Sequence, residues 1–149
     1  MNPVLSNITL FVYLVTTLKY ILFLIHRRPL MLKIAMGGAI VGFLFHTATL
    51  IIFSAEVRRF PFANFSESLS IFVWAIVLVH LVTEWRHNIP ALGSFVMPLV
   101  LLGMTFASLL PSEGTPLLPV VRDFWFFIHV VFAFIGTAAF TLTFGVGIM

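Results

Sequence analysis

The sequence of 149 residues contains no cysteine. This absence excludes disulfides, thiolate metal ligands, CxxC redox chemistry and any thioether bond between this chain and a prosthetic group. Charge is also scarce, because charged residues make up only 9% of the chain, against about 25% in soluble domains. Eight basic and five acidic residues are too few for a nucleic-acid surface, so we expect no nucleic-acid partner.

Common catalytic motifs are missing as well. The sequence has no glycine-rich phosphate loop, no HExxH pair and no nucleophile elbow, which disfavours an ATPase or a hydrolase. Broken helices with charges at mid-membrane, typical of transporters, are not indicated either, apart from Pro98. Whether the chain is an enzyme stays open, and we do not expect catalysis from this chain alone.

Apolar residues dominate what is present. They make up 61% of the chain, and the mean hydropathy is +1.16. About 20 apolar residues cross a hydrocarbon core of about 30 Å. We therefore predict an all-α integral membrane helical bundle, one transmembrane domain over residues 1–149, with five spans at about 4–25, 34–55, 66–83, 91–110 and 124–149. The last run has no polar flank, and we expect the chain to be the N-terminal part of a longer protein.

Basic residues predict the orientation. Five of them, Lys19, Arg27, Arg28, Lys33 and Arg86, fall on one side of the predicted spans, against three on the other, Arg58, Arg59 and Arg122. The side richer in lysine and arginine normally faces the cytoplasm. The N-terminus is thus predicted outside, and the outer loops are "EVRRFPFANF" and "PSEGTPLLPVVRD".

His46 lies deep in the second span. Gly38, Gly42 and His46 recur every four residues and Thr49 follows three later, so the four share one helix face. A GxxxG pair lets helix backbones approach closely. Two interpretations remain open: a groove that presents the imidazole to a ligand, or a packing interface in which the buried histidine bonds to a neighbour.

His129 lies near the start of the fifth span, four residues after Trp125. The two share a helical stripe with the small residues Ala133 and Gly136, and with Phe140. The opposite side, Phe124, Phe127, Val131 and Phe134, suits lipid or bulky packing. An imidazole here could ligate the iron of a flat ring that Trp125 partly covers, or it could be an interfacial histidine beside an aromatic belt residue.

Two shorter patterns concern helix ends. Asn64 and Glu67 have the spacing of a capping box before the third span, and a further role for Glu67 in orienting a ligand or an arginine is open. His80 precedes Glu84 by one turn, and we expect a hydrogen bond between them.

Three stretches resemble a known family in their order and spacing. These are "HTATL" from His46, "FPFANFSESLSIFVW" from Phe60, and "PLLPVVRDFWFFIHVVFAFIGTAAF" from Pro116. Over about residues 40–149 the chain resembles the front part of CcsA/ResC/HemX-type cytochrome c assembly proteins. The tryptophan-rich loop and later histidines of that family have no counterpart in this sequence.

The resemblance implies a multi-pass protein of the cytoplasmic membrane that handles haem at the outer face for attachment to apocytochrome c. It implies non-covalent haem with His129 as an iron ligand, and Trp125 and His46 are the further candidate haem contacts. A CcsB-like membrane partner, apocytochrome c and membrane lipid are the implied partners. The alternatives are a non-catalytic anchor, a bundle that binds b-type haem or quinone, and a HemX-like regulator of haem biosynthesis.

Overall fold

A computed structural model describes residues 3–61, 63–110 and 124–149. Those residues form five helices and no strand: α1 (Pro3–His26), α2 (Pro29–Val57), α3 (Phe65–His87), α4 (Leu92–Leu109) and α5 (Phe124–Ile148). All five are long and apolar enough to cross a membrane. The prediction of an all-α bundle with five membrane spans is confirmed. The predicted loop 111–123 lies outside the described residues.

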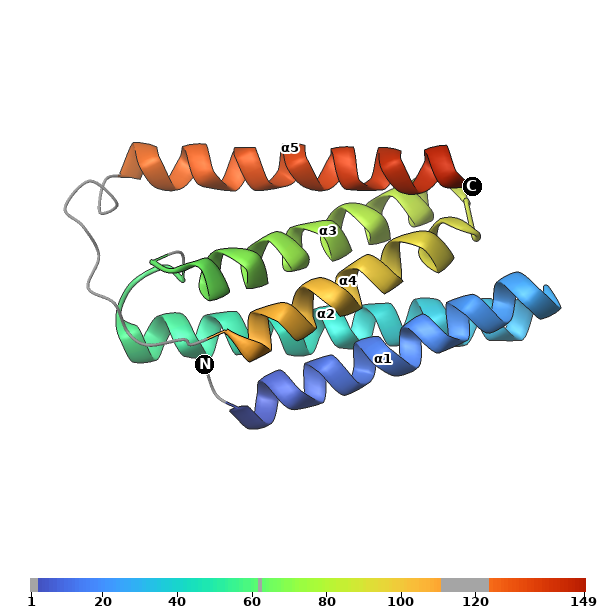
Figure 1. Ribbon diagram of the computed structural model, residues 1–149, viewed down its shortest axis with the longest axis horizontal. Coiled ribbons are helices and arrows are strands. Elements are labelled where there is room, and N and C mark those ends of the chain that lie inside the picture. The colour runs from blue at the N-terminus through green and yellow to red at the C-terminus, as the bar shows by residue number, and fades with distance from the viewer. Residues whose placement is uncertain (1–2, 62, 111–123) are drawn as a thin grey trace.

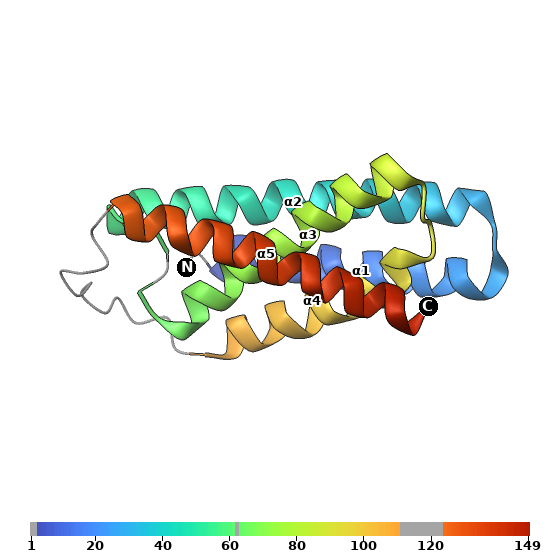
Figure 2. The ribbon, with the colours of Figure 1, turned by 90° about the horizontal axis from the view of Figure 1, so that it is seen from above.

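The helices run side by side along one axis and alternate in direction (Figures 1 and 2). Helix α1 packs against α2 and α4, α3 packs against α4 and α2, and α5 lies on α3 and α4. We call the end with the α2–α3 connection the Glu67 end, and the end with the α1–α2 and α3–α4 connections the Lys33 end. The Glu67 end also carries the start of α5 (Figure 1).

Two helices extend further than the predicted spans. Helix α2 begins at Pro29, before the predicted start at 34, because proline favours the first helical turn. Helix α3 continues past residue 83 to His87, where Asn88 adopts a left-handed conformation (φ 51°) and donates its N–H to the carbonyl of Glu84. These end turns carry charged residues, so the helices continue beyond the apolar runs from which the spans were predicted. Pro98 lies inside α4 and does not end it.

The GxxxG pair lies where α1 and α2 approach each other. A Cβ atom on Gly42 would lie 2.5 Å from Cε1 of Tyr13, and one on Gly38 would lie 2.5 Å from Oγ1 of Thr16. Side chains larger than glycine would therefore push α1 away from α2. The close packing predicted from this motif is present, and it brings the ring of Tyr13 into the bundle, where the ring is fully buried.

Candidate functional site

Helix α1 sends a polar stripe into the bundle. Five of its six hydroxyl-bearing residues are buried at spacings that keep them on one helix face: Ser6, Thr9, Tyr13, Thr17 and Tyr20. Tyr13 and Tyr20 are the two tyrosines of the sequence, and each meets a histidine of another helix at 5.7 or 5.8 Å between ring centroids. Buried polar groups need such partners because hydrocarbon offers none.

His46 is held by α1 and α3. The hydroxyl of Tyr13 lies 3.2 Å from Nδ1 of His46, and Oγ of Ser70 lies 3.0 Å from Nε2. The imidazole is fully buried. These are the contacts of the packing interpretation, since both ring nitrogens already have partners. A ligand at His46 would have to displace Tyr13 or Ser70, and the ligand role of His46 stays a prediction.

We expect Tyr13→Phe to lower the free energy of unfolding by about 1 kcal/mol, because it leaves Nδ1 of buried His46 without its partner. Unfolding of the detergent-solubilised protein, followed by circular dichroism, measures the change. Thr137→Val is the control, since the exposed Thr137 hydroxyl bonds only to a carbonyl of its own helix. Equal stability of Tyr13→Phe and the wild type would contradict the assigned bond.

A second polar cluster lies toward the Lys33 end. Nε2 of His80 lies 3.2 Å from Oε2 of Glu84, so the contact expected from their spacing is present. The sequence did not reveal the third member, Tyr20, whose hydroxyl donates to the same carboxylate oxygen at 2.5 Å. Within the described part of the chain, Nδ1 of His80 and Oε1 of Glu84 have no hydrogen-bond partner.

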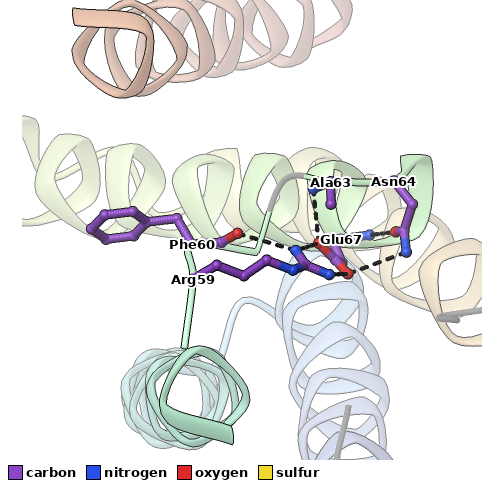
Figure 3. Close-up of polar contacts among 5 residues, drawn as sticks. All are labelled: Arg59, Phe60, Ala63, Asn64 and Glu67. Atoms are coloured by element: carbon purple, nitrogen blue, oxygen red, sulfur yellow. Dashed lines mark hydrogen bonds and ion pairs between the residues drawn. The ribbon is translucent and has the colours of Figure 1, made fainter. Parts of the chain in front are cut away.

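The α2–α3 connection is organised around Glu67 (Figure 3). Asn64 is the N-cap of α3, and its side chain accepts the N–H of Glu67 at 2.8 Å. Arg59 donates to both carboxylate oxygens of Glu67, at 2.7 and 2.9 Å, and the N–H of Ala63 donates at 2.8 Å. The Glu67 side chain is fully buried, and that of Arg59 is 13% exposed. Hydrogen bonding to Glu67 raises the pKa of Arg59, so the guanidinium stays charged.

His129 and Trp125 lie on the outer surface of α5 near the Glu67 end. Trp125 is 73% exposed, and His129, Ala133, Gly136 and Phe140 are exposed as well. The other face of α5 packs inward, with Phe134 against Phe72 at 6.1 Å between ring centroids. None of the residues that the structure describes forms a hydrogen bond with the imidazole of His129.

The predicted site residues therefore occupy three separate places. His46 on α2 bonds to α1 and α3, His129 and Trp125 lie on α5, and Asn64 with Glu67 lies at the start of α3. Helix α5 contacts α3 and α4 and does not contact α2, so His129 and His46 do not form one site. Over the described ranges, no group of three or more histidine, aspartate or glutamate side chains could hold a metal ion.

Comparison with known proteins shows what the chain is similar to. The chain is 31% identical over 131 residues to the cytochrome c biogenesis protein CcsA of Gloeobacter violaceus, and 30% identical over 130 residues to CcsA of a Synechocystis species. Each alignment covers 85% of this chain. This chain is a homologue of the CcsA proteins. The predicted family resemblance is confirmed.

The CcsA relatives are much longer than this chain, which covers 39% of each of these two proteins. CcsA of a Picosynechococcus species is 37% identical over 89 residues, or 56% of this chain. No protein-family model and no solved structure matches the chain.

Proposed function

We propose that this chain acts in cytochrome c biogenesis, as a membrane component that handles haem at the outer face for attachment to apocytochrome c. The observation that carries the proposal is the similarity to proteins named cytochrome c biogenesis protein CcsA over 85% of the chain. We propose as partners apocytochrome c and a CcsB-like membrane protein, and as location the cytoplasmic membrane. The five helices are long and apolar enough to cross a membrane, as a membrane component requires.

We assign the iron contact to His129, with haem bound non-covalently. Its imidazole is exposed and takes no hydrogen bond from the described residues, so a lone pair is free for a metal. Ala133 and Gly136, on the same stripe, leave a low surface beside the ring, and Trp125 offers an exposed aromatic face. When bound, haem would supply the vinyl groups and the iron of the attachment reaction. The chain's part is to hold and orient it.

We propose that the Glu67 end faces outward, with the N-terminus on the same side. The support is the charge distribution, because Lys33, Arg27, Arg28 and Arg86 gather at the opposite end, and basic ends of membrane helices favour the cytoplasm. This orientation would place His129 and the Arg59–Glu67 pair on the outer side, where apocytochrome c receives its haem.

We expect His129→Ala to lose most of the haem that co-purifies with the wild type, because the imidazole that would hold the iron is removed. The absorption spectrum and the haem content per protein of the detergent-purified chain measure the effect. His87→Ala is the matched control, since His87 is exposed at the Lys33 end, away from the proposed site. Unchanged haem content and an unchanged spectrum in His129→Ala would reject the assignment.

The buried histidines favour a second candidate. The Tyr13–His46 and Tyr20–His80 contacts fit a non-catalytic anchor in which the histidines serve packing, whereas a bundle that binds b-type haem or quinone would need one of these contacts to open. A HemX-like regulator of haem biosynthesis shares the same family resemblance. Normal cytochrome c in a deletion strain, together with haem retained by His129→Ala, would favour this candidate over the first.

A further inference from the structure

A groove of about 170 Å³ runs between α1 and α2 in the half of the bundle near the Lys33 end. Its walls are mostly apolar, and several of them are exposed on the outer surface, including Phe11 at 65%, Val15 at 37% and Ile34 at 47%. Gly38 lines the groove without a side chain. In a membrane, such a surface faces lipid chains.

The groove is lined by a residue whose hydroxyl group makes no hydrogen bond to the part of the chain that the structure describes. Oγ1 of Thr16 is buried and has no hydrogen-bond partner among the described residues. Its neighbours on α1 behave differently, since Thr9 and Thr17 each donate to the carbonyl four residues earlier. Thr16 lines the groove, and its buried hydroxyl lies against Gly38, so turning this side chain toward the groove would present its donor to an acceptor there.

The basic residue Lys19 lies at the part of the groove nearest the Lys33 end. Lys19 is half-buried and lines the groove three residues after Thr16, about 5 Å further along the helix axis at 1.5 Å per residue. Beyond it lie the exposed basic residues Arg27, Arg28 and Lys33. This part of the groove therefore suits an anion whose remainder is apolar.

We propose that this groove binds an acidic glycerophospholipid. The order of groups along the groove matches that of the lipid: Lys19 for the phosphate, the Thr16 hydroxyl for an ester carbonyl one turn deeper, and the apolar walls near Val15 and Phe11 for an acyl chain. A free fatty acid would present its carboxylate to Lys19 but has no ester for Thr16. A lipid without net charge would lack the attraction to Lys19.

Native mass spectrometry of the detergent-solubilised chain tests the proposal, with phosphatidylglycerol, phosphatidylcholine and oleate as probes. We expect phosphatidylglycerol to bind most tightly. Lys19→Gln should weaken its binding about fivefold, the effect of one lysine on an anionic headgroup, and Lys33→Gln less than about twofold. Lys33 is the matched control because it is exposed at the same end and does not line the groove.

Further variants distinguish binding in the groove from general electrostatic attraction of the lipid to the basic end of the bundle. Val15→Trp should fill the groove and abolish binding, whereas Leu14→Trp, at an exposed neighbour that does not line it, should leave binding unchanged. Thr16→Val should weaken phosphatidylglycerol and leave oleate unaffected. Equal binding of phosphatidylglycerol and phosphatidylcholine, equal losses in Lys19→Gln and Lys33→Gln, or tighter binding of oleate than of phosphatidylglycerol would overturn the proposal.

Discussion

Replacement of Glu67 by alanine should lower the free energy of unfolding by about 3 kcal/mol, because removing one partner of a buried ion pair strands the other. Arg59 would lose two hydrogen bonds, and the N–H of Ala63 would lose its acceptor. The start of α3 would then lose the side-chain link to Arg59, which follows the end of α2. Thermal or denaturant unfolding in detergent, followed by circular dichroism, measures the loss.

Glu56→Ala is the control for that experiment. Glu56 carries the same charge and lies on the last turn of α2, but it is exposed, so its removal should change stability by less than about 0.5 kcal/mol. Glu67→Gln should fall between the two, because the amide keeps an acceptor and loses the charge. A Glu67→Ala protein as stable as Glu56→Ala would show that the pair contributes nothing.

Gly42→Val is the second substitution with a large expected effect, again about 3 kcal/mol, from overpacking at the α1–α2 contact. A Cβ atom at this position would lie 2.5 and 2.7 Å from two ring carbons of Tyr13. The ring cannot turn aside without leaving His46, to which its hydroxyl is bonded. The variant therefore combines a steric clash with a lost hydrogen bond.

Gly37→Val provides a matched control within the same helix. A Cβ atom on Gly37 would meet nothing within 4 Å, so this variant has the same change in chain entropy without the clash. We expect it to unfold at the wild-type temperature or slightly above. Similar losses for Gly37→Val and Gly42→Val would mean that helix α2 tolerates no valine here, and that Tyr13 is not the cause.

The apolar runs predicted the architecture because, in a membrane, length and hydropathy decide which segments form helices. The cap at Asn64 was equally readable, since it depends on a residue three positions away. The helix ends were harder to place. Lys33 and Glu84 lie just outside the predicted spans, yet both lie within helices, because polar side chains in an end turn can reach the interface.

The contact of His80 with Glu84 was readable from their spacing, but the partners that the histidines find on other helices were not. Tyr13 and Tyr20 stand in an apolar run whose pattern shows which face they share, but not which helix that face meets. Arg59 was counted only as a topology signal, although it bonds to Glu67 eight residues later. Such pairings depend on how helices and turns pack in three dimensions. The predicted roles of His129 and Trp125 in binding haem stay proposals.

The position of both tyrosines on α1 implies an order of events during insertion into the bilayer. Tyr13 finds His46 33 residues later, within the first helical hairpin, whereas Tyr20 must await His80 and Glu84, 60 and 64 residues later. Until α3 emerges from the ribosome, the Tyr20 hydroxyl enters hydrocarbon without its final acceptor. A closed α1–α2 hairpin would therefore still hold unsatisfied polar groups, among them the Tyr20 hydroxyl and Nε2 of His46, and the arrival of α3 would supply partners for both.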